Sequence, residues 1–233
     1  MPQPALTREH LRTPKAAAIA GILFSVLLTT ALALMRLSVP VNPLEPGAWL
    51  RTDARIVGLA LNLIPFAGIA FLWFVGVVRD RLDLREDRFF ATVFMGSGLL
   101  FLALLFTAAA VIGALITAST KVPEELIGSA AFRIARSIAY IIVNIYAVKM
   151  AGVFVISAST VALYTKFAPP WIALLGYCVA LLLFFGSIYT NWVFLAFPAW
   201  VLVLSTYILL DNLKSPAAAV KSPDQSRESS RSR

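Results

Sequence analysis

Long apolar blocks alternate with short polar segments along this chain. Six blocks have the length and apolarity of membrane-spanning helices, because a helix needs about 20 apolar residues to cross the hydrocarbon core. We expect these six spans at residues 16–35, 56–78, 89–118, 137–164, 171–188 and 192–210. No strand-type alternation is long enough to indicate a barrel. The pattern predicts an all-α polytopic membrane protein, a bundle of six transmembrane helices, with polar tails at 1–15 and 211–233.

The first apolar block has an alternative interpretation as a cleaved signal peptide. A basic start, an apolar run and the small residues of Ala31-Leu32-Ala33 fit that alternative. The apolar run at 16–35 is longer than the roughly 7–15 residues of a signal core. We therefore expect an uncleaved first helix.

The distribution of lysine and arginine predicts an orientation for the six spans. With the N-terminus in the cytoplasm, the inner segments hold thirteen of these residues and the outer segments six. The outer six are Arg36, Arg51, Arg55, Lys121, Arg133 and Arg136. The positive-inside rule then predicts that both termini are cytoplasmic. Six outer positive charges also suggest that some of them meet anionic lipid headgroups. The tail at 211–233, rich in Ser, Pro, Lys and Arg, is expected to be disordered and cytoplasmic.

The composition limits the chemistry of the chain. Of its 233 residues, 60% are hydrophobic and 14% charged, and the only histidine and cysteine are His10 and Cys178. Catalytic pairs with histidine, and metal sites built from cysteine and histidine, therefore have no basis here. We expect no catalytic residue, no metal and no cofactor. The net charge of +8 comes mainly from helix ends and tails, which favours an orientation signal over nucleic-acid binding.

Lys149 is the most informative single residue, because it is the one charge inside an expected span. A lysine at the centre of a span costs about 2.5–3.5 kcal/mol, and such residues usually face a cavity or a partner. Asn62, Asn144 and Asn191 are candidate polar neighbours toward the outer side. Together they predict a positively charged ligand site. The alternative is that Lys149 extends to the outer headgroups and has no ligand.

These features leave three functional hypotheses. The first is binding or transport of a small or lipid-like anionic ligand, by a monomer or a homo-oligomer. The second is a non-catalytic scaffold or partner subunit of a membrane complex. The third, a lipid-modifying enzyme, is disfavoured because no span offers a carboxylate or a histidine for acid–base chemistry.

The charged segment RDRLDLREDR, at residues 79–88, follows Gly76 between the second and third expected spans. It resembles the loop between the second and third helices of major facilitator transporters. The matching positions are Gly76, Asp80, Arg81 and Arg85. Asp83 and Leu84 depart from that family's glycine and basic residue. The resemblance implies a cytoplasmic charged loop with Asp80, Arg81 and Arg85 as its functional residues.

A second resemblance covers residues 64–101, beginning IPFAGIAFLWFVG. This stretch is similar to uncharacterised multi-pass membrane proteins of bacteria. The resemblance implies a location in the bacterial cytoplasmic (inner) membrane. It implies no reaction, substrate or site residue.

Overall fold

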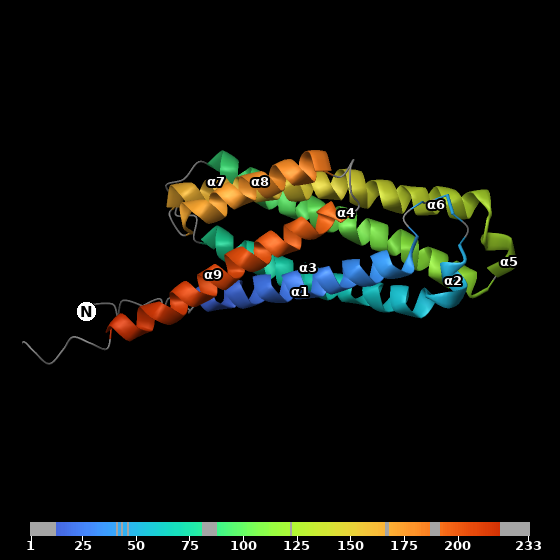
Figure 1. Cartoon of the computed structure of the whole chain (residues 1–233), viewed down its shortest axis with the longest axis horizontal. Coiled ribbons are helices and arrows are strands. Elements are labelled where there is room, and N and C mark those ends of the chain that lie inside the picture. The colour runs from blue at the N-terminus through green and yellow to red at the C-terminus, as the bar shows by residue number, and fades with distance from the viewer. Residues whose placement is uncertain are drawn as a thin grey trace, which may run out of the picture.

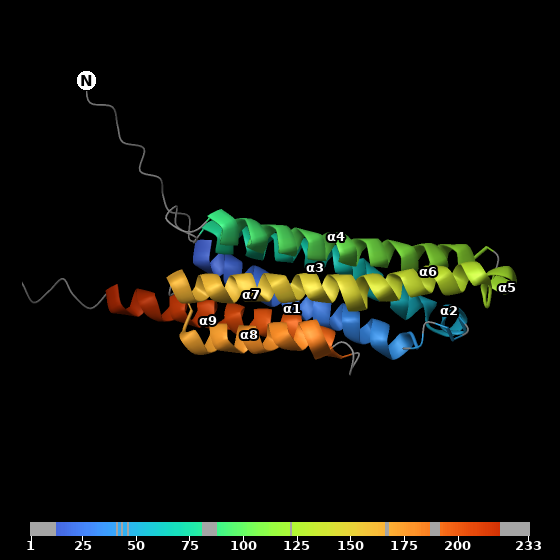
Figure 2. The same cartoon turned by 90° about the horizontal axis from the view of Figure 1, so that it is seen from above.

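The computed structural model describes residues 13–40, 42, 44–45, 47–80, 88–121, 123–165, 168–186 and 192–219. These residues form helices and short connections and contain no strand. The long helices lie side by side in an elongated bundle (Figure 1, Figure 2). The all-helical prediction is confirmed.

Two kinds of helix make up the bundle. The long ones are α1 (Thr13–Ser38), α3 (Ala54–Asp80), α4 (Arg88–Ser119), a continuous run of α6 (Ala130–Ile141), η1 (Ile142–Ala147) and α7 (Val148–Thr165), and α9 (Ala196–Ala219). The short ones are α2 (Trp49–Thr52), α5 (Pro123–Leu126), α8 (Pro170–Phe185) and the 3-10 turn η3 (Val193–Leu195). Five helical stretches among the described residues are long and apolar enough to cross a membrane. This supports a membrane-embedded helical protein.

The fifth expected span, at residues 171–188, is shorter in the structure than the sequence predicted. Helix α8 has 16 residues, about 24 Å of helix, against a hydrocarbon core of about 30 Å. It begins at Pro170, after the extended residue Pro169, and Gly186 follows its last residue. Helix α9, in contrast, continues past the expected end at residue 210 to Ala219.

The two ends of the bundle differ in the number of helices that they contain. We call the end where α1 begins and α9 finishes the terminal end, and the opposite end the α5 end. Helices α8 and α9 form a hairpin that occupies the terminal part of the bundle, whereas α4 and the run from α7 to α6 continue to the α5 end (Figure 1). The α5 end therefore contains fewer helices.

Phenylalanine rings fill the core shared by the helices near the hairpin. The ring centroid of Phe71, on α3, lies between 4.6 and 6.4 Å from those of five other phenylalanines. Helices α1, α3, α4, α7 and α9 contribute these five, which are Phe24, Phe74, Phe101, Phe154 and Phe197. All are fully or almost fully buried. Interlocking rings from five helices give this region close packing.

Small residues let helices approach one another in the same region. A Cβ at Gly176 would lie 1.9 Å from Ser159 Oγ, and one at Gly21 would lie 2.0 Å from Ser205 Oγ. These contacts join α8 to α7 and α1 to α9. Close contacts through small residues are typical of helix packing in lipid.

The connection after α4 differs from the sequence-based expectation. The sequence predicts a connector at residues 119–136 with a short interfacial helix that carries Arg133 and Arg136. In the structure these two arginines lie on α6, which continues through η1 into α7. Exposed isoleucines explain the continuity, since one face of this stretch is apolar while its arginines lie on others. These isoleucines are Ile134, Ile138, Ile141 and Ile145. Pro65 lies within α3 without ending it.

Candidate binding cavity at the α5 end

A cavity of about 130 Å³ lies beyond the tip of the α8–α9 hairpin, between α1, α3, α4, α6, η1 and the η3 segment. Its walls are mainly apolar, and they include Leu32, Met35, Leu61, Ile64, Leu105, Ala108, Ile112, Val143, Phe194 and Leu195. Four polar residues also line it: Arg36, Arg136, Tyr140 and Asn144. The cavity is therefore an apolar chamber with two cationic side chains.

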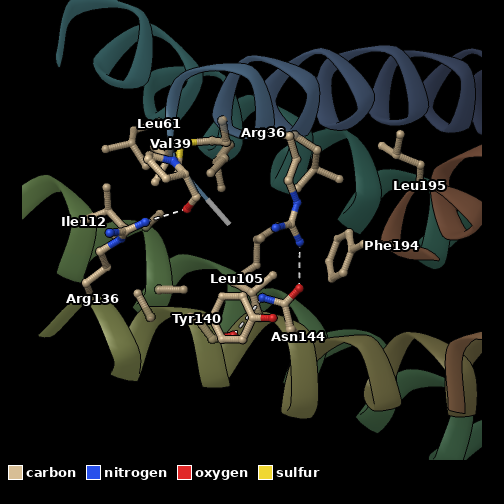
Figure 3. Close-up of a pocket in the computed structure, with 18 of the residues that line it drawn as sticks. Arg36, Val39, Leu61, Leu105, Ile112, Arg136, Tyr140, Asn144, Phe194 and Leu195 are labelled. Atoms are coloured by element: carbon tan, nitrogen blue, oxygen red, sulfur yellow. Dashed lines mark hydrogen bonds between the residues drawn. The ribbon is translucent and has the colours of Figure 1, made fainter. Parts of the chain in front are cut away.

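Arg36 enters the cavity from the last turn of α1. Its side chain is half-buried, and Nη2 donates a hydrogen bond of 2.7 Å to Asn144 Oδ1 on η1 (Figure 3). A cation in the last turn interacts favourably with the negative end of the helix dipole. The bond joins two helices that are 108 positions apart in sequence.

Asn144 is held at both ends of its amide group. Nδ2 donates to the Tyr140 carbonyl at 2.9 Å, which leaves Oδ1 directed at Arg36. Asn144 lies in η1, a π-helical stretch of six residues between α6 and α7. Such stretches are rare and frequently mark functional sites, because the wider turn changes the direction of side chains.

Arg136 enters from α6, two turns before Asn144. It is only 3% exposed, and it donates to two backbone carbonyls in the connector after α1: that of Glu45 at 3.0 Å from Nη1, and that of Pro40 from Nη2. Figure 3 shows Arg136 on α6 with one of these two hydrogen bonds. The start of α6 is fixed by Ser129, whose Oγ accepts from the Phe132 amide at 3.1 Å. Arg136 thus ties α6 to the segment that follows α1.

The balance of charge around the cavity is positive. Within the described part of the chain, neither Arg36 nor Arg136 has a carboxylate at ion-pair distance. Glu45 attracts Arg136 electrostatically but hydrogen-bonds it through its backbone carbonyl. Buried charges are normally paired, so the cavity suits an anionic ligand.

The structure separates the three described residues of the expected ligand site. Asn144 lines the cavity, whereas Asn62 is exposed and donates to Gly58 on its own helix at 3.0 Å. Lys149 does not line the cavity: its Nζ donates to the Phe184 carbonyl at 3.0 Å. That carbonyl belongs to the last turn of α8, where a cation is favourable. Asn191 lies outside the described residues.

Other expected features have different outcomes. In the charged loop, Asp80 is the last residue of α3, and Arg81 and Arg85 lie outside the described residues. Cys178 is exposed. Among the described residues, no group of His, Cys, Asp or Glu side chains could hold a metal ion. The ligand-binding roles assigned from sequence stay predictions.

Arg36 and Arg136 were missed as cavity residues because both stand at the edges of apolar blocks. The sequence does contain a signal for them. Arg136, Tyr140 and Asn144 recur every four residues and so share one face of a helix. The exposed isoleucines lie on the other side of the same helix.

Fold and cavity define the chain as a helical, membrane-type protein with a basic internal site. No family model, curated protein or solved structure matches it.

Proposed function

We propose that this protein binds an anionic ligand in the cavity at the α5 end, with Arg36 as the principal contact. One observation carries the proposal: two guanidinium groups line an apolar cavity without a carboxylate at ion-pair distance among the described residues. A bound anion would supply the missing negative charge.

The donors of Arg36 support its assignment to the ligand. A guanidinium has five N–H donors in a planar fork, which matches carboxylate and phosphate oxygens. Arg36 makes one hydrogen bond within the described residues, to Asn144, so several donors stay available. Two N–H groups of Arg136 donate to carbonyls of the connector after α1, so the main role of Arg136 is to fix the wall of the cavity.

The proposal includes six spans with both termini in the cytoplasm, and the short helix α8 is the fifth of them. The count of thirteen inner against six outer basic residues supports this orientation. The exposed isoleucines of α6 and η1 lie both before and after Arg136 along the helix, and they fit a lipid-facing surface there. The cavity would then open toward the outer leaflet of a bacterial cytoplasmic membrane. Transport of the ligand, as opposed to binding alone, would also require the cavity to open alternately to the two sides of the membrane.

Thermal unfolding in a neutral detergent tests the proposal. Inorganic phosphate, pyrophosphate and dodecyl phosphate are added separately, and a ligand that binds the folded state raises the midpoint as its concentration rises. We expect at least one of these anions to stabilise the parent protein and Arg133→Leu, and to have little effect on Arg36→Leu. Arg133 is the matched control, because it is an exposed arginine on α6. If every anion acts equally on both variants, or none acts on the parent, the proposal is wrong.

A further inference from the structure

We infer that the ligand is a membrane lipid with an acidic phosphate headgroup, which enters sideways from the bilayer between α1 and η1. This inference rests on the proposed function. It adds the source of the anion, its chemical class and its route.

The route follows from where the hairpin ends. Near the terminal end α9 packs along α1, and α8 packs along α7. Helix α8 finishes at Phe185 and α9 begins at Ala196, so neither continues between α1 and η1 toward the α5 end. There, α1 packs mainly on α3, whereas α6 and η1 pack mainly on α4.

The seam between α1 and η1 is bridged by polar side chains. Figure 3 shows Arg36 reaching from α1 toward Asn144 on η1, with Phe194 of η3 beside them. A single hydrogen bond between side chains can open without disturbing either helix backbone. A headgroup arriving at this seam would meet the guanidinium of Arg36 first.

The apolar lining of the cavity favours a lipid over a free anion as the ligand. Leu32 lies one turn before Arg36 on the same face of α1, and Leu195 and Phe194 supply further apolar wall. A soluble anion would use the guanidinium and leave these walls without a partner. A lipid would place its phosphate at Arg36 and its first methylene groups against the apolar walls.

The size of the cavity indicates that only part of the ligand lies inside. About 130 Å³ is well below the roughly 300–1,000 Å³ of pockets that enclose whole drug-sized ligands. The acyl chains would therefore stay in the bilayer, along the lipid-facing surface. Leu37, the residue after Arg36 on α1, is 79% exposed and adds to the apolar surface of that helix.

The experiment reconstitutes the full chain in phosphatidylcholine nanodiscs containing a minor fraction of phosphatidic acid, and measures retained lipid by native mass spectrometry. Four proteins are compared: the parent, Arg36→Leu, Arg133→Leu and Leu32→Trp. We expect the parent and Arg133→Leu to retain phosphatidic acid in preference to phosphatidylcholine. Arg36→Leu should bind it roughly tenfold or more weakly, since a hydrogen bond to a charged group is lost.

Leu32→Trp separates the lipid from a free anion. The indole would fill the space for the first methylene groups while Arg36 stays in place. We expect loss of preferential phosphatidic acid retention but preserved stabilisation by inorganic phosphate, which also shows that the variant is folded. If Leu32→Trp does not fold, Leu195→Trp introduces similar bulk from η3.

Three outcomes would overturn the inference. If inorganic phosphate stabilises the parent through Arg36 but phosphatidic acid is not retained, the ligand is a soluble anion and the proposed function stands. If Arg36→Leu and Arg133→Leu retain equal amounts of phosphatidic acid, the lipid binds only to the surface. If neither phosphate nor lipid binds through Arg36, the proposed function falls as well.

Discussion

The two ends of the bundle differ in packing although α1, α3 and α4 contribute to both. Near the terminal end, buried phenylalanines from five helices surround Phe71. Toward the α5 end the same helices enclose a cavity with Arg36 and Arg136 in its wall. The difference arises because helix α9 of the hairpin supplies Phe197 to the first region, whereas only the turn of the hairpin, with Phe194 and Leu195, reaches the second. One region fixes the arrangement of the helices, and the other leaves space for a ligand.

Polar contacts also differ between the two regions. In the packed region the serines are inward and close to glycine: Ser159 faces Gly176 and Ser205 faces Gly21. In the cavity region Arg136 and Asn144 make directional hydrogen bonds that join separate segments of the chain. The packed region also contains side-chain hydrogen bonds between helices, such as that from Trp200 Nε1 to the Ile172 carbonyl. In the cavity region such bonds come from side chains that line the open space.

Phe71→Ala should give the largest effect on stability. It removes a fully buried ring at the centre of the phenylalanine cluster, and such truncations cost about 3–5 kcal/mol. The control is Phe66→Ala on the same helix, where the ring is 62% exposed and little should change. Unfolding in detergent measures both variants, and equal losses would show that the cluster is not the stabilising core.

Leucine substitutions at two buried alanines compare the regions directly. Ala67, in the packed region, has no exposed surface, so Ala67→Leu should cost about 1–3 kcal/mol through overpacking. Ala108 lines the cavity, so Ala108→Leu should be tolerated while it weakens anion binding. Thermal unfolding with and without dodecyl phosphate gives both readouts. A larger loss for Ala108→Leu would mean that the cavity is already filled.

Arg136→Met should lower the free energy of unfolding by about 1–3 kcal/mol. The change removes two charged hydrogen bonds to the carbonyls of Pro40 and Glu45, partly offset because a buried charge is also removed. Arg133→Met on the exposed side of α6 is the control and should be nearly neutral. Limited proteolysis of the connector after α1 should become faster only in Arg136→Met. Unchanged cleavage would contradict the anchoring role.

Lys149→Met should have the smallest effect. The lost hydrogen bond to the Phe184 carbonyl is offset by removal of a charge within the span, so we expect a change within about 1 kcal/mol. Stabilisation by anions should be retained, because Lys149 does not line the cavity. Loss of that stabilisation would instead place Lys149 in the ligand site.

The sequence predicts the helices better than it predicts the site. Apolar block length indicates the long helices correctly, since lipid requires continuous apolar segments. It treats the helix that carries Arg133 and Arg136 as separate from the fourth span, because these arginines interrupt the apolar block, whereas in the structure one helical run continues from α6 to α7. The spacing of the apolar residues along α6 is a better guide to the start of this helical run.

The cavity itself has no signal in local sequence. It depends on where α8 ends relative to α1 and η1, which is a property of helix packing rather than of any one segment. Asn144 was named from the sequence only as a polar neighbour of Lys149, whereas its partner in the structure is Arg36, which was assigned to an outer segment. Lys149 stood out for its charge, and the structure gives it a carbonyl of α8 as partner.

A structure of the protein with dodecyl phosphate, in detergent or nanodiscs, tests the central claim most directly. We predict a phosphate group hydrogen-bonded to the guanidinium of Arg36, about 2.7–2.9 Å from its nitrogen atoms, with the alkyl chain leaving between α1 and η1. Density for the phosphate at an exposed residue such as Arg133, with the cavity empty or closed by side chains, would contradict the account.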